Sequence, residues 1–191
     1  MYDLNQKPNL KPFRDYDEHD VVNLFAHVDG DVNRGTFVSL VSGSNPDAHA
    51  SEYVQSLQNV PVKAVSLRTA NPWKVENASA AGTRAFGMTL YDVRETNEWG
   101  EKYIYQPRYE SSEQQIVMSG ESVPVLRQGI VELNGFDGAP DAGSGAIIDP
   151  ANDGQLLVVD PAGVTNPRDL VGTFLTQPGA DGYALFSVEL N

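Results

Sequence analysis

The chain contains no cysteine among its 191 residues. The absence of thiols excludes a disulfide scaffold and any thiolate metal centre. Long apolar runs are missing too, because no stretch approaches the roughly 18 apolar residues that a membrane-spanning helix needs. The first residues, MYDLNQKPNLKPF, lack the apolar core of a secretion signal. We therefore expect no secretion signal and no membrane partner.

Positive charge is scarce. The 13 Lys and Arg residues face 26 Asp and Glu residues, which gives a net charge of −13. A protein that binds the nucleic-acid backbone needs a cationic face, so we expect no nucleic-acid partner. Residues 129–191 hold nine acidic side chains and a single cation, Arg168, whereas residues 1–14 carry three cations and one acid. A solvated acidic surface is the simplest explanation, and a cationic partner surface is the alternative.

Short apolar or alternating segments recur along the chain, separated by turn residues. The 17 Gly and 12 Pro residues are consistent with many turns. A spacing of about 8–15 residues without βαβ alternation indicates a mainly β protein, an antiparallel β-barrel or sandwich. We expect residues 21–28 and 36–43 to pair as a hairpin with a long loop. The other expected strands are residues 62–67, 84–93, 103–109, 114–119, 121–135, 146–148, 155–160, 170–177 and 183–190.

The domain organisation follows from the breaker residues. Residues 1–20 are expected to form an extended N-terminal arm, because Pro8 and Pro12 exclude a helix interior. Residues 21–191 are expected to form a single β-rich body. Within this body, residues 44–81 are expected to be an insertion or excursion between barrel strands, with a loop over residues 71–81. Residues 136–145 are expected to be a Gly-rich linker before the closing strands.

Large apolar groups are spaced along the arm, unlike in a purely disordered tail. They must be buried either on the chain's own domain or on a neighbouring protein. We expect the neighbour, and we expect that residues 1–14 can be removed without unfolding the body. The apolar residues are Tyr2, Leu4, Leu10, Phe13 and Tyr16, and the cations among them are Lys7, Lys11 and Arg14.

Residues 29–35 place oxygen-bearing side chains at alternate positions, as a calcium-binding loop does. The similarity to an EF-hand loop fails in three ways. Glycine stands at the seventh position, where the EF-hand has it at the sixth; the twelfth position is Leu40 instead of Glu; and the flanks are typical of strands. Asx and Gly side by side are also common in hairpin turns, so we expect a turn and no metal.

No other segment predicts catalysis. Residues 143–150 resemble one motif of the dUTPase family, but the Tyr-Arg-Gly that follows in that family is absent, which leaves a strand ending in a turn. His19, His27 and His49 lack the spacing of metal ligands. No Ser lies in a nucleophile-elbow context. We therefore expect no enzyme activity and no cofactor.

Several turn-and-strand patterns resemble those of capsid decoration (cement) proteins of tailed phages, whose small domain is a β-barrel of the β-tulip type. The KPNLKPF segment of the arm is also similar to the start of small virion proteins of marine and cyanobacterial phages. The resemblance covers about two-thirds of the chain, and its best part is the C-terminal part. The segments that carry it are residues 35–40 (GTFVSL), 86–92 (FGMTLYD), 160–163 (DPAG), 171–175 (VGTFL) and 182–190 (GYALFSVEL).

The resemblance implies a non-enzymatic virion protein on the capsid surface. Such proteins bind the outside of the shell, often as homotrimers, and bridge subunits of the major capsid protein. The arm would make the contact through Tyr2, Leu4, Lys7, Leu10, Lys11, Phe13, Arg14 and Tyr16.

Two other classes remain open. A receptor- or carbohydrate-binding module of a phage tail or fibre would place Trp73 and Trp99 in an exposed cleft. An all-β hydrolase would need an acid, His or metal cluster in one pocket.

If residues 29–35 form a turn and hold no metal, a chelator should leave the stability unchanged. We expect the same Tm with and without EDTA, measured by circular dichroism. A large drop in Tm on EDTA addition would contradict this interpretation.

Overall fold

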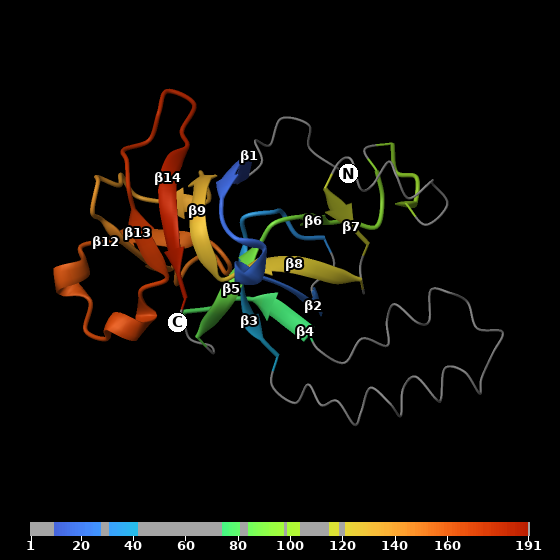
Figure 1. Cartoon of the computed structure of the whole chain (residues 1–191), viewed down its shortest axis with the longest axis horizontal. Helices are drawn as coiled ribbons and strands as arrows, with labels where there is room; N and C mark the ends of the chain where they lie inside the picture. Colours follow the sequence, from blue (N-terminus) through green and yellow to red (C-terminus); the bar gives the residue numbers. More distant parts are fainter. Residues whose placement is uncertain are drawn as a thin grey trace.

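The computed structural model describes residues 10–27, 31–41, 74–80, 84–97, 99–103, 115–118 and 121–190 (Figure 1). In this part of the chain the protein is mainly β, as the strand-and-turn pattern predicts. The helices here are single 3-10 turns, at Glu18–Asp20, Pro161–Gly163 and Pro167–Asp169. None of the described helices is long and apolar enough to cross a membrane.

Five strands form a closed barrel in the order β2-β4-β3-β5-β8. Strand β8 pairs with both β5 and β2 and so closes the barrel, which leaves no open edge. All neighbours are antiparallel except β2 and β4, which are parallel. The strands are β2 (Val21–His27), β3 (Phe37–Leu40), β4 (Lys74–Asn77), β5 (Ala85–Thr89) and β8 (Ser122–Leu126).

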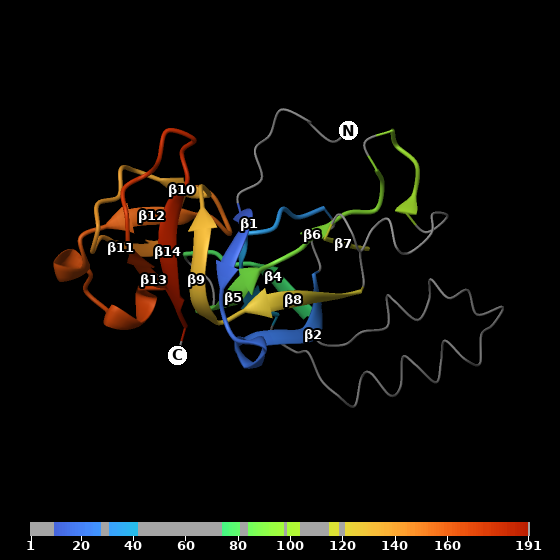
Figure 2. The same cartoon turned by 45° about the horizontal axis from the view of Figure 1, so that its top comes forward.

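A seven-stranded sheet lies beside the barrel, in the order β1-β9-β14-β13-β11-β12-β10 (Figures 1 and 2). Its two edge strands are β1 and β10, and a separate two-stranded sheet pairs β6 with β7. The strands of the large sheet are β1 (Leu10–Asp15), β9 (Gln128–Leu133), β10 (Phe136–Asp137), β11 (Gly145–Ile148), β12 (Leu156–Val159), β13 (Gly172–Phe174) and β14 (Ala184–Glu189). The small sheet consists of β6 (Asp92–Val93) and β7 (Ile116–Val117).

The closing strands show the alternation that the sequence predicts. In β14, Ala184, Phe186 and Val188 are buried, whereas Leu185 and Ser187 between them are only partly buried. Successive side chains of a strand point to opposite faces of the sheet, so one face of β14 packs on the core. The expected strands at residues 155–160, 170–177 and 183–190 are confirmed as β12, β13 and β14, with β13 shorter than expected.

One apolar core joins the barrel to the large sheet. Phe37 of β3 is fully buried, and its ring centroid lies 6.2 Å from that of Phe186 in β14. The next residue, Val38, is also fully buried but belongs to a second cluster with Val75 and Val125. Strand β3 is therefore buried on both faces, because Phe37 packs in the shared core and Val38 in the smaller cluster of barrel residues.

A single residue, Arg127, connects β8 of the barrel to β9 of the sheet. Its backbone N–H donates to the carbonyl of Asp20 at 2.9 Å, and its carbonyl accepts from the N–H of Leu190 at 3.1 Å. Its guanidinium carbon lies 5.2 Å from the centroid of the Phe86 ring, and Nη2 donates to the carbonyl of Leu190 at 3.3 Å. Arg127 thus contacts the barrel through Phe86 of β5 and the large sheet through Leu190, the residue that follows β14.

The predicted hairpin between residues 21–28 and 36–43 is wrong. Both strands exist, but β4 lies between them in the barrel, parallel to β2 and antiparallel to β3. The expected loop over residues 71–81 is also wrong, because residues Lys74–Asn77 form strand β4. The expected strand at residues 62–67 lies outside the described residues. The Gly-rich linker at residues 136–145 begins with a strand, β10, which pairs with β12.

The arm also needs correction, because residues 10–15 belong to the body. They form β1, which pairs with β9 through Leu10↔Leu133 and Asp15↔Ile130. Extended backbone was expected here, and the free edge of β9 supplies its hydrogen-bond partners. Pro12 falls within the irregular part of the pairing on an edge strand, a position where a strand can accept proline.

Leu10 is fully buried in the shared core, so truncating it should destabilise the protein. We expect Leu10→Ala to lower the free energy of unfolding by about 2–5 kcal/mol. The matched control is Leu175→Ala, since Leu175 is 41% exposed, and it should change the stability by less than about 1 kcal/mol. Urea titration followed by circular dichroism measures both, and equal effects would show that Leu10 is not a core residue.

Candidate functional site

Lys11 fastens the N-terminal strand to the body. Its ammonium group forms an ion pair with Glu132 of β9 at 3.0 Å and a second, hydrogen-bonded one with Asp181 in the turn before β14. It also lies 4.5 Å from the centroid of the Tyr183 ring, within the range of a cation–π contact. The side chain therefore links β1 to its neighbour β9 and to the turn that precedes β14. These four residues form a clamp, which consists of Lys11, Glu132, Asp181 and Tyr183.

The charges at this clamp shift the pKa values of its members. The hydrogen bond from Lys11 lowers the pKa of Asp181 below its ordinary value of 3.8, and the N–H of Tyr183 adds to this effect. The hydrogen bonds to Asp181 and then to Glu132 raise the pKa of Lys11 above 10.5. Burial raises the pKa of the Tyr183 hydroxyl. All these shifts except the last favour the charged pair at neutral pH.

The structure accounts for three of the arm residues expected to bind the capsid. Leu10 lies in the chain's own core and Lys11 in the clamp, so their side chains contact the body. Tyr16 is partly buried against the same core. Tyr2, Leu4 and Lys7 lie outside the described residues, as do the side chains of Phe13 and Arg14 within β1.

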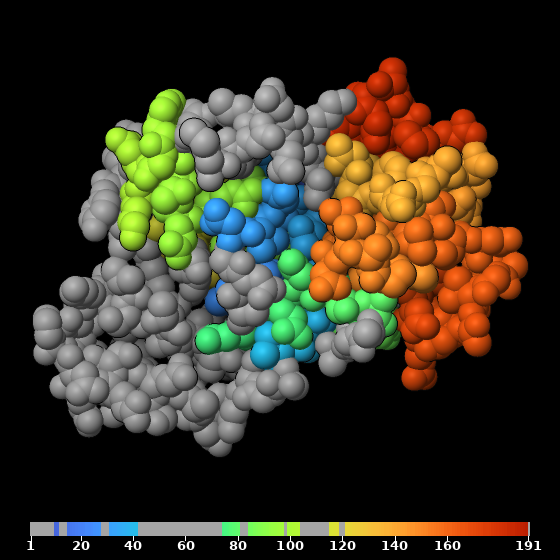
Figure 3. Space-filling model, turned by 180° about the vertical axis from the view of Figure 1, so that it is seen from behind, coloured from blue at the N-terminus to red at the C-terminus, as the bar shows by residue number. Residues whose placement is uncertain are grey.

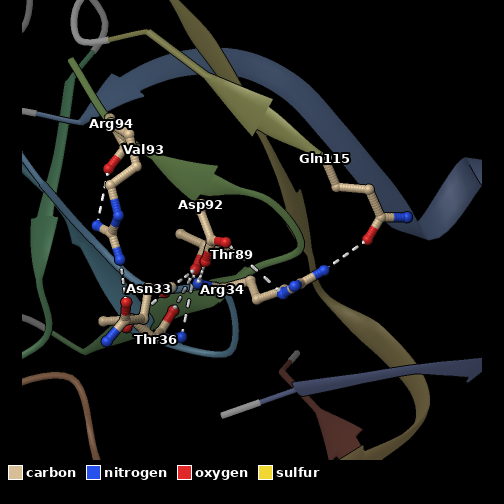
Figure 4. Close-up of polar contacts among 8 residues, drawn as sticks. All are labelled: Asn33, Arg34, Thr36, Thr89, Asp92, Val93, Arg94 and Gln115. Carbon is tan, nitrogen blue, oxygen red and sulfur yellow. Dashed lines mark hydrogen bonds and ion pairs between the residues drawn. The ribbon is translucent and has the colours of Figure 1, made fainter. Parts of the chain in front are cut away.

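In the loop at residues 29–35, which was compared with a calcium-binding loop, the described side-chain oxygens accept hydrogen bonds from other protein groups (Figure 4). The side-chain oxygen of Asn33 accepts a hydrogen bond from Arg94, and its carbonyl accepts from the hydroxyls of Thr36 at 2.8 Å and Thr89 at 3.1 Å. Asp31 accepts from the N–H of Glu95 at 3.2 Å. Asp29 and Gly30 lie outside the described residues. Among the residues that the structure describes, no group of three His, Asp or Glu side chains could hold a metal.

A neighbouring network of polar contacts satisfies the buried carboxylate of Asp92. Asp92 is 4% exposed; one of its oxygens accepts from the N–H of Arg34 at 2.7 Å, and the other lies 3.8 Å from Nε of Arg34. Nη1 of Arg34 donates to the side-chain oxygen of Gln115 at 2.9 Å (Figure 4). Gln115 has a φ of 58°, a left-handed conformation that is uncommon for a residue other than glycine. These contacts tie the loop before β3 to β6 and to the residue that precedes β7.

Sequence reasoning missed this network. Its members come from three separate segments, and no local motif marks an ion pair between residues 58 positions apart. The available signal was the charge of Asp92 within the mainly apolar segment GMTLYDV, residues 87–93.

Asp149 caps a turn after β11, in agreement with the expectation that residues 143–150 are a strand ending in a turn. It directly follows β11 and is 3% exposed. One carboxylate oxygen accepts from the N–H of Ala151 at 2.8 Å, the other from the Asn152 side chain at 2.7 Å. The bond from Ala151 is the chief reason that the pKa of Asp149 lies below its ordinary value. Its lone pairs are thus engaged within the turn.

The histidines do not assemble into a site within the described residues. His19 lies exposed in the 3-10 turn before β2. His27 is buried at the end of β2, with Nε2 3.1 Å from the side-chain oxygen of Asn77 in β4. His49 lies outside the described part of the chain.

Trp99 lies at the tip of a turn that Asn97 organises. The side-chain oxygen of Asn97 accepts from the N–H of Trp99 at 3.0 Å and from that of Glu101 at 2.8 Å. A bridge between Thr96 and Lys102 closes the base of the turn. The Trp99 side chain is 77% exposed. Trp99 is therefore exposed at the tip of this turn, whereas Trp73 lies outside the described residues.

Sequence comparisons with protein families and with curated proteins found no match. No protein-family model matches the chain, and no curated protein is significantly similar to it in sequence. The fold and the contacts above therefore define the protein: a mainly β chain in which a closed five-stranded barrel packs on a seven-stranded sheet.

The clamp predicts a dependence of stability on pH. Because the pKa of Asp181 is lower in the folded state, its contribution is present above about pH 4 and is lost as the pH falls through the folded-state value. We expect Asp181→Asn to destabilise the protein at pH 7, with a smaller difference from wild type at pH 3. Both side chains are partly solvent-exposed, so the effect at pH 7 should be modest.

Urea titrations at the two pH values measure the difference. In a Lys11→Met background, the effect of Asp181→Asn at pH 7 should shrink, because the main partner of the carboxylate is gone. An effect of Asp181→Asn that is independent of both pH and Lys11 would contradict the clamp.

Proposed function

We propose that the chain is a non-enzymatic virion protein that binds the outer surface of a phage capsid and bridges subunits of the major capsid protein. The similarity of its closing strands to those of decoration proteins supports the proposal. The structural observation that carries it is the position of β1, an edge strand whose first residue, Leu10, is anchored in the core. Residues 1–9 precede this anchor and join the body at the open edge of the large sheet.

A bridging protein stabilises a shell by mass action. It binds the assembled state and not the separated subunits, so it lowers the free energy of the shell alone. A rigid body suits this role, because a load on one attachment point reaches the other through the core. The body described here has such a core, shared between barrel and sheet.

The proposed capsid contact now centres on residues 1–9, which include Tyr2, Leu4 and Lys7. An extended peptide can add a strand to an exposed sheet edge, with alternate side chains entering pockets. Ordering the segment costs roughly 1–2 kcal/mol per residue in backbone entropy, so burial of apolar side chains such as Tyr2 and Leu4 must offset much of that cost. Many copies on one shell act together and raise the total affinity.

The other expected contacts keep a secondary role in the proposal. Phe13 and Arg14 lie on β1, next to the segment that would bind, and Tyr16 follows that strand. We propose a homotrimer on the capsid surface, because proteins of the class that the chain resembles often sit at local three-fold positions.

Removing residues 1–9 should abolish binding to the shell and leave the body folded, since Leu10 and Lys11 remain. We expect wild type to co-sediment with empty shells that lack it, and the truncated protein to stay in the supernatant. Circular dichroism should show the wild-type Tm for the truncated protein to within a few degrees.

A Tyr2→Ala/Leu4→Ala variant of the full chain tests the same contact without a change in length. Undiminished binding of both variants would overturn the role of residues 1–9.

The exposure of Trp99 favours a second candidate function, a receptor- or carbohydrate-binding module of a phage tail or fibre. An aromatic ring in water is a common platform for stacking on a sugar. This function would require binding of an oligosaccharide by the isolated protein and no affinity for empty shells.

A further inference from the structure

Trp99 contributes little to the fold by burial. It is 77% exposed, whereas the next most exposed large apolar side chain in the described residues, Leu24, is 43% exposed. Tryptophan is highly buried on average in folded proteins. A partner that covers the ring would remove a large apolar surface from water.

The turn holds Trp99 in place without using its ring. Asn97 is 7% exposed, and its side chain accepts from two backbone N–H groups of the turn. Its backbone N–H donates to the carbonyl of Glu101 at 2.9 Å, and its carbonyl accepts from the N–H of Gly100 at 3.0 Å. Gly100 has a φ of 80°, which an L-residue rarely adopts. A partner therefore meets a preformed turn, and little backbone entropy is lost on binding.

The described surroundings of the turn are acidic. Asp31, Glu95 and Glu101 are exposed beside it, against the exposed cation Lys102. Among the described residues near the turn, a second cation, Arg94, is 8% exposed and bonded to Asn33. This charge disfavours a phosphate-bearing ligand and is complementary to a cationic surface.

The Asn97 amide is engaged within the turn and is not free to bond a sugar hydroxyl. A sugar site combines an aromatic face with polar side chains that are free to bond hydroxyl groups. The amide nearest to Trp99 in the chain is that of Asn97. Its oxygen is engaged by two N–H donors, and its nitrogen donates to Glu101 at 3.3 Å.

We propose that the turn formed by residues 96, 97 and 99–102 is a protein-binding anchor, in which Trp99 inserts into an apolar pocket rimmed by Lys or Arg side chains. The proposal rests on the proposed function and makes the capsid shell the partner. It gives the chain a second contact besides residues 1–9. Figures 1 and 3 show the turn, in yellow-green, at the opposite end of the molecule from β12 and the adjacent 3-10 turns.

The first test compares Trp99→Ala with Leu175→Ala in the full chain. Both remove an exposed apolar side chain, but Leu175 follows β13 in the large sheet. We expect Trp99→Ala to weaken co-sedimentation with empty shells by about 10-fold or more, as truncation of an interface anchor does. Leu175→Ala should bind as wild type does, and both variants should keep the wild-type Tm.

The second test observes Trp99 directly. Trp73 is the only other tryptophan, so in a Trp73→Phe variant the emission comes from Trp99 alone. We expect acrylamide to quench this emission strongly in the free protein and weakly in the shell-bound protein. Added salt should weaken shell binding, because it screens the acidic turn from a cationic rim.

The outcomes separate the two proposals. If wild type binds shells and Trp99→Ala binds equally well, the anchor is wrong and the proposed function stands. If wild type does not bind shells, the proposed function fails and the anchor fails with it. If oligosaccharides alter the Trp99 emission and shells do not, the turn is a sugar-binding site and the protein anchor is overturned.

Discussion

The fold depends on the two-sided burial of β3. Phe37 packs on Phe186 in the core shared with the large sheet, and Val38 packs with Val75 and Val125 of the barrel. An edge strand or a solvated strand could not connect the two clusters. Since β3 belongs to the closed barrel and its Phe37 packs in the core shared with the large sheet, this strand holds the barrel against the sheet.

The sequence was informative where strand signals are local. Alternation along residues 183–190 predicted β14, because one face of that strand is buried and the other is not. Strand β4 carries no such signal: in Lys-Val-Glu-Asn, only Val75 is fully buried. Its parallel pairing with β2 joins segments that are far apart in the chain, so the sequence suggested a hairpin between neighbours.

The arm illustrates a different limit. Composition indicated that its apolar groups need burial, but composition does not say on which protein. Leu10 turned out to pack in the chain's own core, and Lys11 faces two of the acids that made residues 129–191 seem an unbroken acidic surface. Part of the positive charge near the N-terminus, that of Lys11, thus pairs with acids of the large sheet and of the turn before β14. Lys7 is the cation that precedes β1 in the sequence. The network of Arg34, Asp92 and Gln115 was not predicted either, since it forms only once the fold brings those segments together.

The single-residue connection at Arg127 has a consequence for how the molecule comes apart. Strand β8 belongs to the barrel and β9 to the sheet, and Arg127 between them is bonded to Asp20 and to Leu190. No linker allows the barrel to separate while the sheet survives, because opening either one pulls on a strand of the other. We therefore expect the barrel and the sheet to unfold together, in a single all-or-none transition.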